Sequence, residues 1–170
     1  MKFLFPPLFV ALLLAAGPAM AAPAPALFDL TGDWRGTGAI REAPDAPARE
    51  GRCRFSAIPL RPGEEIRLKG RCATQAGSAE LSMRFVLLDG GVLAAGVATS
   101  LREGSVQFDG RLDGAVARLQ SREPITLDDV TGISHVTVRV EDAAHFTLRQ
   151  WFAPADGSEP VVLVDMRFQR

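Results

Sequence analysis

Two cysteines, Cys53 and Cys72, are the residues best placed to do chemistry, since their thiols can form a disulfide or bind a metal ion. Pro62 and Gly63 lie midway between them and are typical of the central positions of a tight turn. A chain folded back at this turn sets Cys53 opposite Cys72 and gathers apolar residues on their side, and a shift of one residue would lose both agreements. We therefore predict a disulfide-linked β-hairpin. A zinc site is not favoured, because two thiols and two distant histidines lack the required spacing.

No other set of side chains has the spacing that catalysis requires. None of the serines lies in a G-x-S-x-G motif, and Gly90-Gly91 is typical of a hairpin turn rather than of a phosphate-binding loop. Asp128 and Asp129 are adjacent carboxylates, more typical of solvated turn or capping positions than of a general acid–base pair. Together with Thr126 they predict one short helical turn. We expect the protein not to be an enzyme and to carry no cofactor and no metal.

The first 21 residues are organised like a secretory signal peptide. Lys2 supplies a basic start, residues 8–16 are almost wholly apolar, and Ala19-Met20-Ala21 is a small-residue cleavage site. The apolar run is too short to favour the alternative, an N-terminal membrane anchor. We predict a signal peptide at 1–21, a mature domain at 22–170, a periplasmic or secreted location and no integral membrane span after signal removal.

The charge pattern gives no indication of a polyanionic partner. The formal net charge is −1, and the arginines are scattered along the chain. This balance gives no electrostatic reason to expect nucleic acid or an anionic membrane surface. Lys2 and Lys69 are the only lysines, which is typical of a GC-rich bacterial source.

Alternation of apolar and polar residues predicts an all-β protein. Alternating segments recur from residue 32 onward, with short connections and no long amphipathic helix, and they amount to about ten strands. An antiparallel meander of that length closes on itself because closure removes exposed edges. We therefore predict a single antiparallel up-and-down β-barrel over residues 22–170.

Two Asp-Gly dipeptides predict two-residue hairpin turns within this meander. We expect these turns at residues 89–90 and 113–114, with the cross-strand pairs Leu87–Val92 and Phe108–Leu119. A further turn near residue 143 sets His135 opposite Trp151 and His145 opposite Glu141. Both histidines then fall on the polar, outward face of their strands.

The first strand resembles that of a known family. Residues 32–38 read Gly-Asp-Trp-Arg-Gly-Thr-Gly, and this G-x-W-x-G-x-G motif resembles the opening strand of lipocalin-like (calycin) barrels, most closely that of nitrobindin-like domains. The resemblance implies a basic residue near the C-terminus beside the first-strand tryptophan, here Arg170 beside Trp34. Nitrobindin-like barrels also hold haem through a histidine near the C-terminus. His135 and His145 match no such segment, so haem binding is the least favoured function.

We expect a non-catalytic barrel with one of two functions. In the first, the barrel is hollow and binds a small apolar or amphipathic ligand in the periplasm. In the second, the core is filled and the loops meet a protein partner of the cell envelope. A cavity of roughly 300 Å³ or more would favour the first function. Its lining would comprise Trp34, Phe55, Leu68, Met83, Phe85, Phe108, Val138, Leu148 and Met166.

Overall fold

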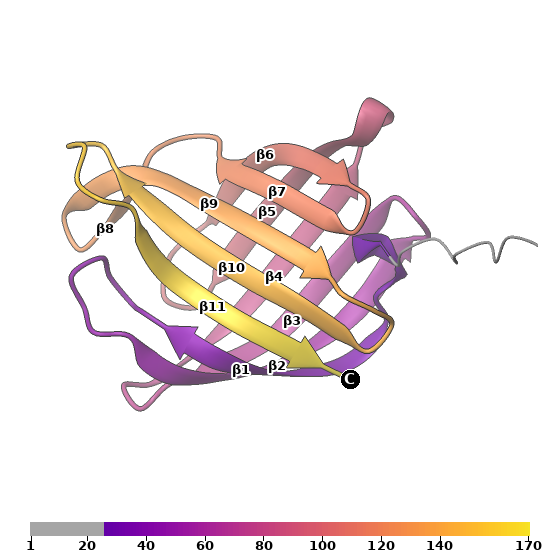
Figure 1. Cartoon of the computed structure of the whole chain (residues 1–170), viewed down its shortest axis with the longest axis horizontal. Coiled ribbons are helices and arrows are strands. Elements are labelled where there is room, and N and C mark those ends of the chain that lie inside the picture. Colours follow the sequence, from indigo (N-terminus) through magenta and orange to yellow (C-terminus); the bar gives the residue numbers. More distant parts are fainter. Residues whose placement is uncertain (1–25) are drawn as a thin grey trace, which may run out of the picture.

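The computed structural model describes residues 26–170 and shows an all-β fold (Figure 1). The predicted signal peptide, residues 1–21, and its cleavage site lie outside the described residues. Eleven strands form one antiparallel sheet. Their bounds are β1 Gly32–Ile40, β2 Arg49–Arg61, β3 Glu65–Ala73, β4 Ser78–Leu87, β5 Val92–Thr99, β6 Ser105–Asp113, β7 Val116–Ser121, β8 Ile125–Leu127, β9 Val130–Val140, β10 His145–Pro154 and β11 Val161–Gln169. Two single-turn 3₁₀ helices are present, η1 Leu27–Asp29 and η2 Asp89–Gly91.

Ten of these strands close into a barrel, as predicted. From β1 to β7 each strand pairs with the next, and β9 then pairs with both β7 and β10. The ring closes where β11 pairs with β1, with Arg35 opposite Gln169 and Ile40 opposite Val164. Only β8 lies outside the ring, because it pairs with β9 alone. In Figure 1 strands β9 to β11 cross in front of β3 to β5, so two walls of the barrel face each other across one core. Among the described residues, no helix has the length and apolarity needed to cross a membrane.

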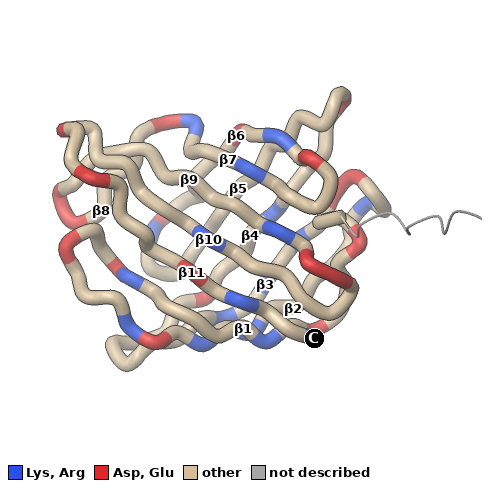
Figure 2. The backbone as a smooth tube through the Cα atoms, viewed as in Figure 1, with Lys and Arg blue, Asp and Glu red and all other residues tan. Residues whose placement is uncertain are grey.

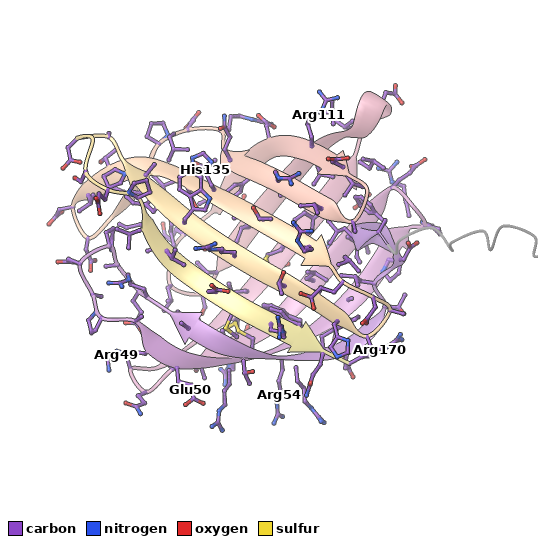
Figure 3. The ribbon with its side chains drawn as sticks, in the orientation of Figure 1. Arg49, Glu50, Arg54, Arg111, His135 and Arg170 are labelled. Atoms are coloured by element: carbon purple, nitrogen blue, oxygen red, sulfur yellow. A yellow bond between two sulfur atoms is a disulfide. The ribbon has the colours of Figure 1, made fainter. Side chains whose placement is uncertain are left out.

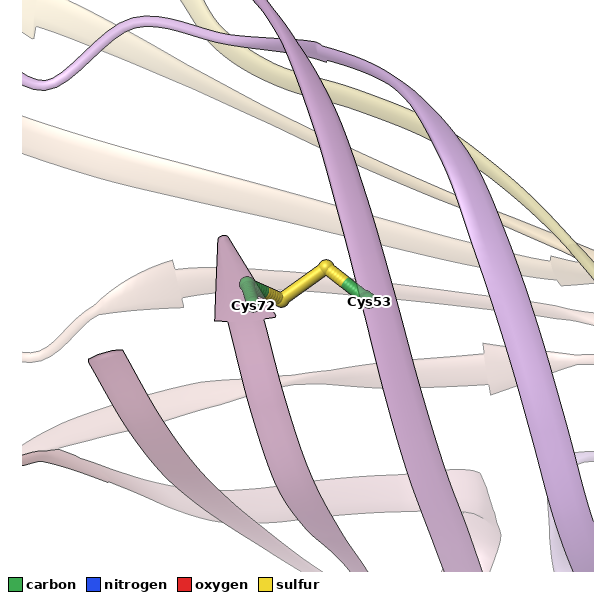
Figure 4. The surroundings of a disulfide bond; sticks show 2 residues. All are labelled: Cys53 and Cys72. Carbon is green, nitrogen blue, oxygen red and sulfur yellow. A yellow bond between two sulfur atoms is a disulfide. The ribbon is translucent and has the colours of Figure 1, made fainter. Parts of the chain in front are cut away.

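The β2–β3 hairpin has the predicted register. Cys53 lies opposite Cys72, Phe55 lies opposite Gly70, and the two cysteines are joined by a disulfide (Figure 4). The chain reverses around Gly63, whose φ of +74° is a left-handed conformation that glycine adopts without a steric penalty. Cys53 is buried in the core, so the disulfide ties together the inner faces of two neighbouring strands.

The β4–β5 hairpin differs from the prediction by one residue. Leu87 pairs with Leu93 rather than with Val92. The connection is longer than a two-residue turn, since η2 occupies it and both Gly90 and Gly91 have positive φ values. A second consecutive glycine allowed a longer left-handed connection than the Asp-Gly signal alone predicts.

The β6–β7 hairpin differs by two residues, which keeps the same side chains facing inward. Phe108 pairs with Ser121 rather than with Leu119. The two-residue turn falls on Gly114 and Ala115 instead of on residues 113–114, since the last pair before the turn joins Asp113 to Val116. The turn needs a positive φ, and Gly114 supplies it at the first turn position rather than at the second.

The predicted helical turn at residues 126–129 is wrong. Asp128 and Asp129 are the exposed two-residue turn between β8 and β9, with φ values of 44° and 68°. Aspartate tolerates this left-handed conformation better than most residues. Thr126 pairs with Thr131 across the hairpin, and their hydroxyl oxygens lie 2.9 Å apart.

Two glycines of the first strand are required by close approach of β11. A Cβ atom at Gly36 would lie 2.4 Å from Cε1 of Phe168, well inside the van der Waals contact distance between two carbon atoms. A Cβ atom at Gly38 would lie 2.0 Å from the backbone oxygen of Asp165. The second and third glycines of the G-x-W-x-G-x-G motif therefore have a steric cause in this chain: β1 must lack side chains where Phe168 and the backbone of the neighbouring strand β11 approach it.

Candidate functional site

The nine residues predicted to line a cavity all lie inside the barrel. Each is at most 7% exposed, and all nine belong to one continuous apolar cluster that extends through the barrel. A smaller cluster of Ile125, Phe152 and Leu163 fills the end next to β8. Leu163 turns inward because the β10–β11 register shifts by one residue between Gln150 and Trp151, which reverses the alternation at this point.

Four aromatic rings form a column across the interior. The Phe146 ring stacks on Phe168 with centroids 4.5 Å apart, and Phe168 stacks on Phe55 at 5.3 Å. The Trp34 ring lies edge to face against the Phe146 ring, with their centroids 4.9 Å apart. Offset and edge-to-face pairs of this kind contribute beyond their buried area. The interior space beside the predicted cavity wall is thus occupied by the chain's own aromatic side chains.

The C-terminal residue, Arg170, lies over Trp34 of the first strand. The guanidinium carbon of Arg170 lies 6.0 Å from the centroid of the Trp34 ring, at the outer limit of a cation–π contact. Nη2 of Arg170 donates a hydrogen bond to Oγ1 of Thr31 (3.1 Å), and Nε1 of Trp34 donates to the backbone oxygen of Thr31 (3.1 Å). Leu27 and Phe28 of η1 are buried against the same cluster and contribute to closing this end of the barrel.

In the part of the chain that the structure describes, two hollows lie on the outer surface of the barrel rather than inside it. The larger, about 420 Å³, lies over β3 to β6, with Arg67 and Arg84 among its lining residues. The smaller, about 320 Å³, lies over β1 to β3. Of the predicted cavity residues, only Trp34 and Phe55 border either hollow. The hollows are therefore features of the outer sheet face, and both polar and apolar residues line them.

Both histidines lie on the outward face of the barrel, as predicted. The rings of His135 and Trp151 stack in parallel, with centroids 3.7 Å apart (Figure 3). Partial burial beneath this stack lowers the pKa of His135 below its ordinary value. His145 lies within 2.9 Å of both carboxylate oxygens of Asp142, and this hydrogen bond lowers the pKa of Asp142. Neither ring faces the interior, where a bound haem would need an axial ligand.

Glu65 forms a charged centre on the outer face that sequence reasoning missed. Its side chain is only 7% exposed, and it accepts hydrogen bonds from Nε of Arg84 (2.6 Å) and Nε of Arg61 (2.9 Å). The bond from Arg84, followed by that from Arg61, lowers the pKa of Glu65. Arg61 is four residues from Glu65 in the sequence, but Arg84 reaches it only through the pairing of β3 with β4.

A row of arginines across β1 to β3 is the second feature that sequence reasoning missed. Arg35 lies directly opposite Arg54, and Arg54 lies directly opposite Arg71. These residues are 17 to 19 positions apart in the chain, so their clustering cannot be seen without the strand register. The expectation that the arginines are scattered is therefore wrong for this part of the surface.

No grouping of three or more metal-binding side chains occurs within residues 26–170. No protein-family model matches the chain, and the search of curated proteins finds no match. The fold is a closed antiparallel ten-stranded barrel, which is consistent with the lipocalin-like class that the first-strand motif resembles.

Proposed function

We propose that this chain is an exported, non-catalytic β-barrel with a filled core, which acts by binding a partner through its outer surface. The observation that carries the proposal is the placement of the nine predicted cavity residues. They pack with one another and with the aromatic column, while both described hollows lie outside. A barrel filled by its own side chains leaves its exterior as the surface for recognition.

Export to the periplasm or medium is part of the same proposal. The signal-like residues 1–21 support it, and so does the cross-strand disulfide, since disulfides persist in oxidising compartments. The absence of a nucleophile elbow from the sequence favours a binding role over catalysis.

The filled core can be tested with an apolar fluorescent probe. The protein exported by its own host should give a native mass equal to that of the polypeptide, and N-phenyl-1-naphthylamine should show no saturable fluorescence increase. Phe146→Ala is the matched variant for a benzene-sized probe: it removes one ring from the buried column, so it should lower the free energy of unfolding by about 3–5 kcal/mol and bind benzene, while the unchanged protein should not.

Two results would contradict the proposal. The first is a co-purifying small molecule, or stoichiometric probe binding by the unchanged protein, which would restore the hollow-barrel function. The second is a stoichiometric Soret band after incubation with hemin that is lost in His145→Ala. This second result would place the chain with haem-binding, nitrobindin-like barrels.

A further inference from the structure

The outer face of β1 to β3 carries an excess of positive charge that the whole chain does not have. Six basic side chains alternate with the buried positions of these strands, against three acidic ones, Asp33, Glu50 and Glu65. Figure 2 shows basic segments recurring along the lower edge of the view, over β1 and β2. We call these six residues the basic face: Arg35, Arg52, Arg54, Arg67, Lys69 and Arg71.

The strand register places like charges next to one another on this face. Neighbouring strands lie about 4.8 Å apart, so the row Arg35–Arg54–Arg71 holds three guanidinium-bearing side chains on successive strands. Like charges directly opposite each other destabilise a sheet. Arg54 points away from the barrel into solvent (Figure 3), so the row is open to a partner from outside.

The acidic residues nearby leave most of this charge uncompensated. Within the described chain, Arg35, Arg54, Arg67 and Lys69 form no ion pair, and Arg71 reaches Glu80 only at 4.0 Å between two exposed side chains. Asp33 accepts a hydrogen bond from Ser56, Glu50 pairs with Arg52, and Glu65 is occupied by Arg61 and Arg84.

The adjoining strands β10 and β11, on the other side of β1, show that the fold does not impose this arrangement. There the register sets Arg149 of β10 opposite Asp165 of β11, and Arg167 lies 3.9 Å from Glu141. Opposite charges alternate across those strands, as favourable cross-strand pairing requires. The same barrel thus pairs opposite charges on β10 and β11 and leaves the outer face of β1 to β3 positive.

Two exposed aliphatic side chains continue the basic face along β2. Ile58 is 41% exposed and lies directly opposite Arg67, and Leu60 is 39% exposed near the hairpin end. Beside the row Arg35–Arg54–Arg71 lies the hollow of about 320 Å³, whose lining includes Arg35, Arg54 and Lys69 and one carboxylate, Asp33. A broad array of cations with neighbouring aliphatic groups suits a surface that presents anionic groups at its boundary with an apolar layer.

We propose that the basic face docks the protein on the anionic phospholipid headgroups of a membrane surface. The phosphate groups would be held by Arg35, Arg54, Lys69 and Arg71, and Ile58 and Leu60 would enter the interfacial layer. This inference rests on the proposed function, since it names the partner of the outer surface. It reverses the expectation drawn from net charge, which averages over both walls of the barrel.

Vesicle sedimentation tests the proposal. Vesicles of phosphatidylcholine with about 30% phosphatidylglycerol should retain the protein at about 50 mM NaCl and release it at about 500 mM, since screening weakens exposed charge interactions. Vesicles of phosphatidylcholine alone should not retain it. Absence of retention by the phosphatidylglycerol vesicles at low salt would overturn the proposal.

A matched pair of variants locates the binding surface. Arg35→Gln with Arg54→Gln removes two charges from the basic face and should weaken vesicle partitioning about 25-fold, at about fivefold for each residue. Arg111→Gln with Arg118→Gln removes two arginines that also face each other across a strand pair, β6–β7, and should change partitioning less than about fivefold, which is less than the share of one basic-face residue. Equal losses in both variants would mean a net-charge effect and would overturn the proposal.

Two further measurements separate the remaining outcomes. Ile58→Ser with Leu60→Ser should weaken binding several-fold without changing the thermal unfolding temperature, since both side chains are exposed. Binding of poly-glutamate, without vesicle binding, would assign the face to an acidic polypeptide and overturn the lipid assignment. The naphthylamine assay on the same preparations reports on the filled core independently, so failure of the lipid inference is distinguishable from failure of the proposed function.

Discussion

Replacing Gly36 with alanine should destabilise the barrel through one identifiable contact. The added Cβ would lie 2.4, 2.6 and 2.8 Å from three atoms of the Phe168 ring. This ring cannot move away freely, because it stacks on Phe146 at 4.5 Å and on Phe55 at 5.3 Å. Relief of the clash must therefore displace the aromatic column or separate β1 from β11, where the barrel closes.

The expected magnitude follows from two opposing effects. Overpacking of a well-packed core costs about 1–3 kcal/mol. Gly→Ala substitution also reduces the conformational entropy of the unfolded chain, which stabilises the folded protein by about 0.4–1 kcal/mol. The net loss of about 1–2 kcal/mol should lower the unfolding temperature by about 2–8 °C for a domain of this size. Gly77→Ala is the matched control, since nothing lies within 4 Å of its Cβ position and only the stabilising effect should remain.

The assay is thermal and urea unfolding of a double-mutant cycle with Phe168→Leu. If the clash is the cause, Gly36→Ala should cost less in the Phe168→Leu background, with a coupling energy of at least about 0.5 kcal/mol. Gly38→Ala should show no such relief, because its Cβ would meet the backbone oxygen of Asp165. An unfolding temperature of Gly36→Ala equal to that of the unchanged protein, or a cycle without coupling, would refute the packing argument.

Three more predictions concern the disulfide, the chain ends and pH. Replacing Cys53 and Cys72 together with serine should lower the free energy of unfolding by up to about 3 kcal/mol, measured by urea denaturation, and an unchanged midpoint would show that the hairpin alone orders these strands. Arg170→Ala should lower it by about 0.5–1 kcal/mol, because the guanidinium is exposed and 6.0 Å from the Trp34 ring; no change in unfolding temperature would remove the contact as a support for closure. Burial lowers the pKa of His135, so the unfolded chain binds a proton more readily and stability should fall as pH drops below about 6.5. His135→Gln should reduce this loss between neutral and mildly acidic pH, and equal pH profiles of unfolding would contradict the assignment.

Features that depend on short-range chemistry were predictable from the sequence. The Pro-Gly turn and the two cysteines specify the β2–β3 register, because a shift by one residue would turn both the cysteines and the apolar residues outward. The same logic placed His135 opposite Trp151. Alternation over short segments was also sufficient to predict a closed, all-β meander, since edges in such a sheet must be paired or covered.

Turn position was less certain in the sequence than the existence of the strands, and at β4–β5 the one-residue difference also reverses the phase of β5, whose Leu93 and Ala95 are the buried residues. The Asp-Gly signals at residues 89–90 and 113–114 marked the right regions but not the paired residues, since neighbouring glycines offered other left-handed conformations. At Asp128-Asp129 the chain forms a turn without any glycine, and the sequence favoured a helix cap. The preference of such residues for a turn or a helix cap is weak, so the pairing of the neighbouring strands determines which of the two forms.

Only the tertiary structure decided which distant residues share a surface. The aromatic column needs β1, β2, β10 and β11 side by side, and the row Arg35–Arg54–Arg71 exists only because three strands align in one register. Net charge and composition are sums over the chain and contain no information about position. Electrostatic repulsion depends on separation, so the difference between the positive face of β1 to β3 and the paired charges of β10 and β11 arises when strand pairing sets these distances.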